Sequence, residues 1–215
     1  MRVVTLENSG AVYTSQVYLV LGDANRLEDV NTLVDVGQDP AVLASLKRAP
    51  TGVGKWPVEQ VVLTHSHSDH CALLPEIRAA FRPKVLAFSP NIEGVDRLLG
   101  DGDSLRMGDA VFEVVHSPGH SSDSICLYNQ SEGVLFAGDS PLLIASPGGS
   151  YEAGFRAALA KLCARNVSRI YFGHGPPLTE RCNQRLRESQ RLAAASAPAG
   201  GRQERMKNQA PVAAK

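Results

Sequence analysis

The stretch Thr64-His65-Ser66-His67-Ser68-Asp69-His70 decides the fold and the chemistry that we expect of this chain. It directly follows Val61-Val62-Leu63, a short continuous apolar run that is typical of a strand buried on both faces. His65 and His67 are two residues apart, so on extended backbone they project to the same side. Asp69 and His70 follow where the chain turns into a helix. Four metal-ligand side chains thus lie just beyond the carboxyl end of a buried strand, where sheets of α/β type open ligand crevices.

Three further candidate ligands share one local pattern, in which an apolar strand leads into a tight glycine-containing turn. They are His120 in Ser117-Pro118-Gly119-His120, Asp139 in Ala137-Gly138-Asp139-Ser140, and His174 in Gly173-His174-Gly175-Pro176. Glycine lets the backbone bend sharply there and brings each side chain toward a shared centre. Chance scattering of surface histidines does not explain a pattern that occurs four times. Imidazole and carboxylate are the ligands that borderline divalent ions prefer.

The number of candidate ligands indicates two metal ions. Seven ligands are too many for one tetrahedral zinc ion, which takes four. Two ions about 3.5–4 Å apart divide them naturally if one carboxylate bridges, and such a pair shares a hydroxide as the nucleophile. We expect zinc, with iron and manganese as alternatives.

The composition predicts a soluble cytoplasmic protein with a small-molecule substrate. The chain has 215 residues, of which 43% are hydrophobic, and its 22 basic residues equal its 22 acidic residues. A balanced chain has no overall field that gathers nucleic acid or anionic membrane, so neither is an expected partner. The four cysteines form no C-x-x-C pair, and no signal peptide or membrane span is evident. The oligomeric state stays open between monomer and homodimer.

The alternation of strand-like and helix-like segments predicts an α+β fold with two mixed sheets packed together and helices outside. Strands are expected over Val3–Leu6, Val12–Leu21, Thr32–Val36, Val61–Leu63, Val85–Phe88, Val111–Val115, Ser124–Tyr128, Val134–Ala137 and Arg169–Phe172. Helices are expected over Pro40–Arg48, from Leu73 to Phe81, around Phe155–Leu162, from Ser89-Pro90 toward Leu99, and from a Thr179 cap to about Leu192. Residues 1–195 are predicted to form one domain, and residues 196–215 a disordered tail that is poor in large apolar residues.

The motifs together resemble the metallo-β-lactamase superfamily, in its glyoxalase II-like branch. The resemblance rests on Leu33-Val34-Asp35-Val36-Gly37, Thr64–His70, His116–His120, Leu135–Asp139 and Gly173-His174-Gly175-Pro176. It implies an αββα four-layer sandwich with the metals at one edge between the sheets. It also implies one metal on His65, His67 and His120. The second metal would then lie on Asp69, His70 and His174, with Asp139 bridging.

The resemblance also implies roles for residues around the ligands. Asp35 corresponds to a carboxylate that orients a ligand histidine, although a plain turn residue before Gly37 is an equal alternative. His116 corresponds to a histidine that forms structural hydrogen bonds. Cys71 matches no ligand position and is expected to pack. Ser121 lacks the closing glycine of a nucleophile elbow and is not expected to act as a nucleophile.

The function that these residues predict is hydrolysis of an ester-like bond, a thioester or a lactone, in a small substrate. Asp69 and Asp139 are the expected catalytic carboxylates, which assist proton movement while remaining ligands. An aspartate at the bridging position is not found in zinc β-lactamases, which argues against antibiotic hydrolysis. The short segment after His174 argues against the additional helical domain with which glyoxalase II binds glutathione.

Three alternatives stay open at this point. An iron-dependent sulfur dioxygenase uses a similar motif set with one metal and would leave Asp69, His70 and His174 as non-ligands. A phosphodiesterase or nuclease of the same fold is disfavoured by the neutral charge. A non-catalytic binding protein has no evident need for an open metal site.

Overall fold

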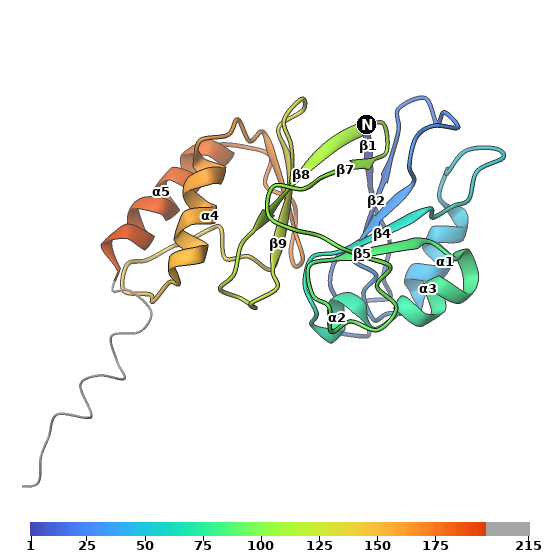
Figure 1. Ribbon diagram of the computed structural model, residues 1–215, viewed down its shortest axis with the longest axis horizontal. Helices are drawn as coiled ribbons and strands as arrows, with labels where there is room; N and C mark the ends of the chain where they lie inside the picture. The colour runs from blue at the N-terminus through green and yellow to red at the C-terminus, as the bar shows by residue number, and fades with distance from the viewer. Residues whose placement is uncertain (197–215) are drawn as a thin grey trace, which may run out of the picture.

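The chain forms two sheets that lie face to face between two layers of helices (Figure 1). This is seen in a computed structural model that describes residues 1–196. The predicted α+β class and the αββα arrangement of two mixed sheets are confirmed. No helix of this described part is long and apolar enough to cross a membrane.

The first sheet follows the order of the chain. Its six strands are β1 (Arg2–Thr5), β2 (Tyr18–Leu21), β3 (Thr32–Val34), β4 (Gln60–Leu63), β5 (Lys84–Ala87) and β6 (Arg97–Leu98). The first two pairings are antiparallel, whereas β3 to β6 run parallel. Parallel neighbours need a crossover, which α1 (Ala41–Arg48) and then α2 (Ser68–Cys71) with α3 (Leu74–Phe81) provide.

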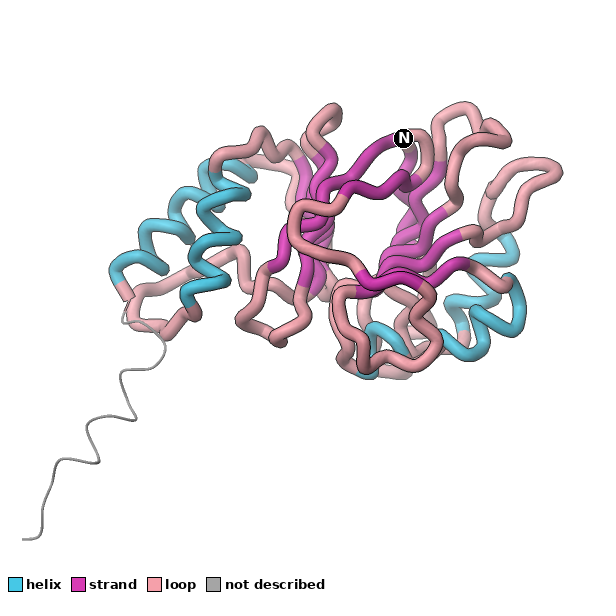
Figure 2. The backbone as a smooth tube through the Cα atoms, in the orientation of Figure 1, coloured by secondary structure: helices cyan, strands magenta, loops and turns pink. Residues whose placement is uncertain are grey.

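The second sheet has the order β11-β10-β9-β8-β7. Its strands are β7 (Ser104–Met107), β8 (Ala110–His116), β9 (Ile125–Asn129), β10 (Val134–Gly138) and β11 (Arg169–Phe172). Three of its pairings are antiparallel, and only β10 and β11 run parallel, joined through α4 (Ala153–Cys163). α5 (Cys182–Ala195) then packs beside α4 on the outer face (Figure 2).

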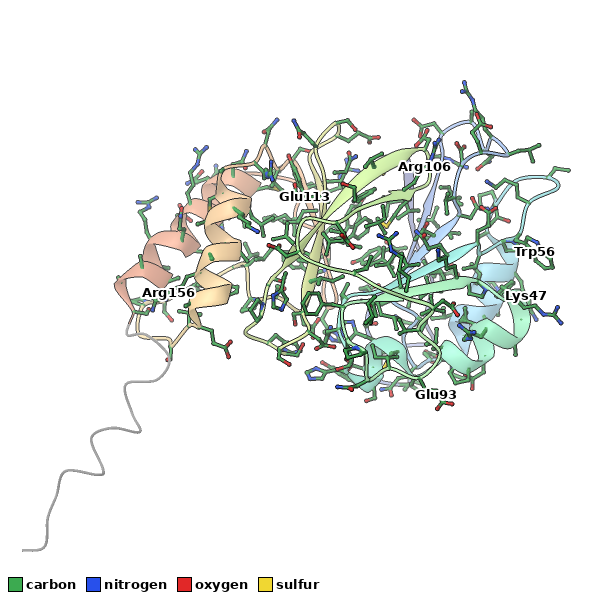
Figure 3. All side chains as sticks on the ribbon, in the orientation of Figure 1. Lys47, Trp56, Glu93, Arg106, Glu113 and Arg156 are labelled. Atoms are coloured by element: carbon green, nitrogen blue, oxygen red, sulfur yellow. The ribbon has the colours of Figure 1, made fainter. Side chains whose placement is uncertain are left out.

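Three apolar layers hold the sandwich together, and β4 shows how one strand serves two of them. Val61 and Leu63 face the layer between the first sheet and its helices, while Val62 faces the layer between the two sheets. Successive side chains of a strand point to opposite faces, which explains why the run is apolar throughout. The third layer lies between the second sheet and α4 with α5. Side chains fill the space between the two sheets in Figure 3.

Two predictions about helices were wrong. No helix follows Ser89-Pro90, because Gly94 has a positive φ of 86° and Asp96 accepts a hydrogen bond from Val85 N. Thr179 does not cap the last helix, which begins at Cys182, because Leu178 still pairs with Ile170 across the preceding turn.

The other corrections concern the amino-terminal strand and the tail. Residues 12–17 are not strand, and β2 begins only at Tyr18. Ser196, the first residue of the predicted tail, is buried, and its carbonyl accepts a hydrogen bond of 2.8 Å from Arg156 Nη2. The rest of that predicted tail, residues 197–215, lies outside the described residues.

Candidate metal centre

The seven predicted ligands lie together where strands of both sheets end. Side chains that each offer one ligand atom form three overlapping groups, with ligand atoms within 4.8 Å of one another. The groups are His65, His67 and His120; His65, His70 and Asp139; and Asp69, His70 and His174. The first sheet supplies the ligands after β4, and the second sheet supplies those after β8, β10 and β11. A backbone hydrogen bond from Ile125 N to Thr64 O, 2.9 Å long, joins the sheets at this edge.

One group is formed by His65, His67 and His120. His67 Nδ1 and His120 Nε2 lie 2.9 Å apart, and both residues are exposed to solvent. His65 is buried, and its Nδ1 is 3.1 Å from Thr64 Oγ1. That contact leaves His65 Nε2 as the ring nitrogen that faces the group. This group is therefore buried at His65 and open to solvent at His67 and His120.

The second group consists of Asp69, His70 and His174. Asp69 Oδ2 is 3.0 Å from His174 Nε2 and 3.7 Å from His70 Nε2. His70 is fully buried, and its Nδ1 lies 2.8 Å from Asp35 Oδ2. A carboxylate accepts but does not donate, so Nδ1 carries the proton and Nε2 presents its lone pair to the group.

Asp35 itself is held in place by Thr64, the residue directly after β4. Its Oδ1 accepts a hydrogen bond from Thr64 N, and its Oδ2 accepts one from Thr64 Oγ1, at 2.8 and 2.9 Å. It is buried and has a positive φ of 59°, a conformation that aspartate tolerates better than most residues. Asp35 thus orients His70 through a contact that satisfies one ring nitrogen and frees the other.

Asp139 lies between the two groups. Its Oδ1 is 3.3 Å from His70 Nε2, and its Oδ2 is 3.4 Å from His120 Nε2 and 3.5 Å from His174 Nε2. One carboxylate therefore reaches nitrogens of both groups, which is the position that a bridging ligand needs.

The ionisation of the cluster follows from burial and from close charges. Burial, together with the charge of His70, lowers the pKa of His65 to about 4. Burial also acts to lower the pKa of His70, but Asp35 and Asp139 outweigh it and raise that pKa to about 10. Burial opposes ionisation of Asp139, yet the close charge of His70, whose Nε2 lies 3.3 Å from Asp139 Oδ1, lowers its pKa to about 2. The carboxylates thus favour a positive charge between them, which a proton on His70 Nε2 supplies without a metal and a metal ion on that lone pair would supply instead.

Two buried nitrogens show that the residues fit a divalent metal. His65 Nε2 and His70 Nε2 are buried and have no hydrogen-bond partner among residues 1–196. Buried polar atoms of native proteins are nearly always paired, so orphaned nitrogens that face carboxylates need an explanation. A cation at each nitrogen, with Asp139 shared between the two, would satisfy both nitrogens, and the donor set of imidazole and carboxylate suits a borderline divalent ion.

Comparison with known proteins settles the family. A family model described as the metallo-beta-lactamase superfamily matches residues 12–93 and 87–174. This chain belongs to the metallo-β-lactamase superfamily. The family predicted from the ligand motifs is therefore confirmed, and members of this superfamily bind divalent metals.

Curated relatives in the superfamily carry names of hydrolases. The hydroxyacylglutathione hydrolase of Klebsiella pneumoniae is 34% identical over 111 residues, which are 50% of this chain and 41% of that protein. The atrochrysone carboxyl ACP thioesterase of Emericella nidulans is 26% identical over 179 residues, 83% of this chain and 57% of the relative. The chain spans about half the length of the curated relatives that it matches.

Solved structures share the metallo-β-lactamase fold. ETHE1 from Myxococcus xanthus superposes with a TM-score of 0.68 at 21% identity, covering 90% of this chain and 85% of that one. TTHA1623 in a di-iron-bound form has a TM-score of 0.63 at 25% identity, covering 85% of this chain and 98% of that one.

Two glycines beside the candidate ligands leave the space that neighbouring side chains of the cluster occupy. A Cβ atom on Gly173 would lie 2.1 Å from Asp139 Oδ1 and 2.6 Å from His70 Cε1. Gly138 has a φ of 51°, and a Cβ atom there would lie 2.6 Å from Thr64 Oγ1. Any side chain at these positions would displace a ligand or the residue behind it.

Three polar residues singled out in the sequence lie beside the cluster without joining a ligand group. His116 stacks on Phe88 with centroids 4.2 Å apart, and its Nε2 lies 2.8 Å from Ser122 O. Cys71 Sγ donates to His67 O at 3.1 Å. Ser121 Oγ donates to Asp123 Oδ1 at 2.7 Å. Each is thus engaged in a local structural contact.

Sequence reasoning missed two residues at the site, Thr64 and Tyr13. Thr64 binds Asp35 through both its backbone and its hydroxyl, and the threonine directly before the first ligand was an available signal. Tyr13 stacks on His174, which lies 161 residues further along the chain. No local pattern signals that contact, because only the fold creates it.

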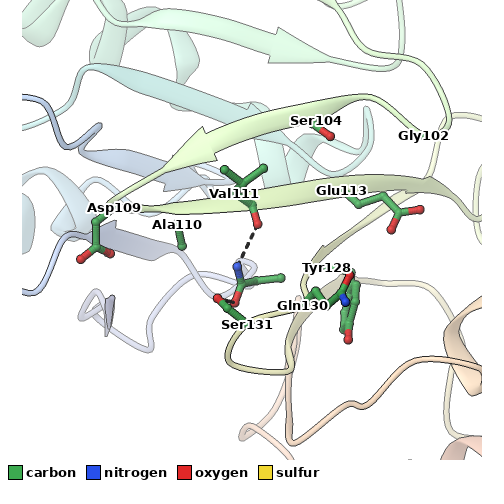
Figure 4. A pocket seen from close by; sticks show the side chains of 10 residues that line it. Gly102, Ser104, Asp109, Ala110, Val111, Glu113, Tyr128, Gln130 and Ser131 are labelled. Carbon is green, nitrogen blue, oxygen red and sulfur yellow. Dashed lines mark hydrogen bonds between the residues drawn. The ribbon is translucent and has the colours of Figure 1, made fainter.

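A hollow of about 540 Å³ lies elsewhere on the molecule (Figure 4). Ten residues of the β7–β8 and β9–β10 region line it, and none of them is a predicted ligand. Asn129 Nδ2 donates to Val111 O at 2.8 Å within it. That side-chain-to-backbone bond serves the sheet edge, and the hollow does not contribute to the metal centre.

Proposed function

We propose that this chain is a hydrolase of ester-like bonds in small molecules, acting on thioesters, with lactones as the alternative substrate class. Two divalent ions, zinc in the first place, would be held by His65, His67 and His120 on one side and by Asp69, His70 and His174 on the other. The observation that carries the proposal is the position of Asp139, whose two oxygens lie within 3.5 Å of nitrogens from both groups. The relatives named as hydroxyacylglutathione hydrolase and thioesterase favour the thioester.

The reaction would add the oxygen of water to the acyl carbon and break the bond between that carbon and sulfur. Bound divalent ions supply Lewis acidity, which lowers the pKa of water and polarises a carbonyl oxygen. Asp69 Oδ2 lies at the partly exposed side of the cluster, where it would accept the proton that the water loses. The leaving thiolate would take up a proton, giving a carboxylic acid and a thiol. Asp139 stays ionised, because its pKa is about 2, and so remains available as a ligand.

The first prediction concerns the substrate class. The zinc-loaded protein should hydrolyse acyl thioesters or lactones faster than β-lactams and phosphodiesters, because a balanced chain of 22 basic and 22 acidic residues lacks the field that polyanions exploit. The measurement is kcat/KM for one member of each class under identical conditions. The fastest turnover on a phosphodiester would leave the fold intact and overturn the proposed function.

The second prediction concerns metal stoichiometry. Protein purified without chelator and supplied with zinc should bind about two ions per chain, since two three-residue groups share one bridging carboxylate. Elemental analysis after gel filtration measures the ratio. A ratio that stays near one, with iron as the retained metal, would favour the alternative of a single-iron sulfur dioxygenase.

A further inference from the structure

Tyr13 is an exposed aromatic residue that lies directly against a ligand of the metal centre. Its side chain is 73% exposed, yet its ring stacks on the imidazole of His174 with centroids 4.9 Å apart and an interplanar angle of 20°. Its hydroxyl lies 3.3 Å from His174 Nε2. Because the ring is so exposed, it buries little apolar surface. Stabilisation of the core therefore does not explain why a tyrosine lies against His174.

The segment that carries Tyr13 is tied to the site by its backbone. Ser15 N donates to Asp69 O at 3.0 Å, and Gln16 N donates to Gly173 O at 2.6 Å. Gln38 Nε2 donates to Tyr13 O. These bonds attach the segment between β1 and β2 to the two loops that present Asp69 and His174. Tyr13 is thus held in its place before any substrate arrives, which is the condition for an effective hydrogen-bond donor.

The Tyr13 hydroxyl lies against the nitrogen that His174 would offer to a metal, at 3.3 Å. The nitrogen that it contacts, His174 Nε2, also faces Asp69 Oδ2 at 3.0 Å and Asp139 Oδ2 at 3.5 Å. No other hydrogen bond to this hydroxyl exists within the described part of the chain. Once the lone pair of His174 Nε2 is used for a metal, the hydroxyl has lost its acceptor and retains a proton to donate.

We propose that the Tyr13 hydroxyl donates a hydrogen bond to the acyl oxygen of the substrate, and a stronger one to the oxyanion that develops from it. The inference rests on the proposed hydrolysis and adds a catalytic residue to it. A donor aimed at a developing oxyanion lowers the barrier because the bond strengthens as charge accumulates. Val12, which precedes Tyr13 in the sequence, is an apolar residue that is 41% exposed, and we use an aliphatic acyl chain as the probe for this reason.

The third prediction is the effect of Tyr13→Phe, which removes the hydroxyl and keeps the stacked ring. With an aliphatic acyl thioester, kcat should fall about 100-fold, as for the loss of one oxyanion donor. KM should change much less, because the bond is strongest in the transition state. Zinc content should equal that of the unaltered chain. The matched control is Tyr151→Phe, at a partly exposed tyrosine that stacks on Phe155, and it should leave kcat unchanged.

Binding of an alkylphosphonate, measured by calorimetry on the zinc-loaded proteins, gives a readout independent of turnover. A phosphonate is tetrahedral and carries its negative charge on oxygen, so it mimics the oxyanion intermediate. Tyr13→Phe should therefore weaken its binding about tenfold or more, whereas Tyr151→Phe should leave the affinity unchanged. Unchanged kcat and unchanged phosphonate affinity in Tyr13→Phe would overturn the inference. Loss of zinc in that variant would overturn it too, by making Tyr13 a support of His174. If the unaltered chain hydrolyses no ester or thioester, the proposed function fails, while phosphonate binding still tests the donor.

Discussion

Asp139→Ala should abolish activity and release both metal ions. The substitution removes the one carboxylate that lies within 3.5 Å of His70, His120 and His174. It also removes the negative charge nearest to the centre. Loss of a residue that merely supports a ligand already costs about 10- to 100-fold in metal affinity, so loss of a ligand shared by two ions should exceed that range. Elemental analysis and kcat/KM of the same preparation measure both effects.

The matched control for Asp139→Ala is His174→Ala, which removes a ligand from one group only. We expect His174→Ala to retain one ion more firmly than the other, whereas Asp139→Ala loses both together. Circular dichroism of each variant checks that the sandwich is folded. A loss of metal from Asp139→Ala equal to or smaller than that from His174→Ala would show that Asp139 does not bridge.

Asp35→Asn should fold and yet bind metal poorly. The amide has the shape of the carboxylate and tolerates the positive φ of 59°. However, the asparagine amide has only one acceptor oxygen, whereas the two oxygens of Asp35 accept hydrogen bonds from Thr64 and His70. An amide NH₂ group facing His70 Nδ1 would move the imidazole proton to Nε2, the nitrogen that must carry a free lone pair. We expect metal affinity to fall about 10- to 100-fold, measured by competition with a chelator.

Two companion variants separate orientation of the ligand from stability. Asp35→Ala leaves the donors of Thr64 and His70 buried without a partner, and we expect a loss of about 3–5 kcal/mol in the free energy of unfolding, as when a buried charged pair is broken. Thr64→Val removes the hydroxyl that contacts both Asp35 and His65 Nδ1, and it leaves the contact between Asp35 and His70. It should lower the melting temperature slightly and weaken metal binding less than Asp35→Asn does, because the contact that sets the tautomer of His70 remains. If Asp35→Asn binds zinc as tightly as the unaltered chain, Asp35 does not set the tautomer of His70.

The layers of the fold were predictable because burial leaves a periodic signal. The continuous apolar run of β4 and the regular apolar spacing of α3 both appear where the sequence pattern placed them. The helix expected after Ser89-Pro90 failed for a physical reason. A capping serine and a proline suit the first turn of a helix, but Asp96 is used by a distant strand and by Arg78 at 3.0 Å. Tertiary contacts of this kind override local propensity, and no local pattern reports them.

The clustering of the candidate ligands was predictable for a different reason. Each follows a strand directly, so the topology of the sheets converts positions in the sequence into positions in space. Tyr13 has no such signal. Its neighbours suggested a strand, but hydrogen bonds to Asp69 and Gly173 hold the segment outside the sheet. The contact with His174 spans 161 residues, and it becomes visible only when both sheets are in place.

The division of the candidate ligands between the two sheets couples metal binding to the stability of the sandwich. His65, His67, Asp69 and His70 belong to one half of the sandwich, and His120, Asp139 and His174 belong to the other. A cation bound by both halves would be a cross-link that chelators can remove, unlike a covalent one. Its binding would depend on the apolar layer between the halves, in which Val62 and Phe136 are buried. We therefore expect substitutions that weaken this layer to lower metal affinity first. Removal of metal by a chelator should in turn lower the stability of the packing between the sheets.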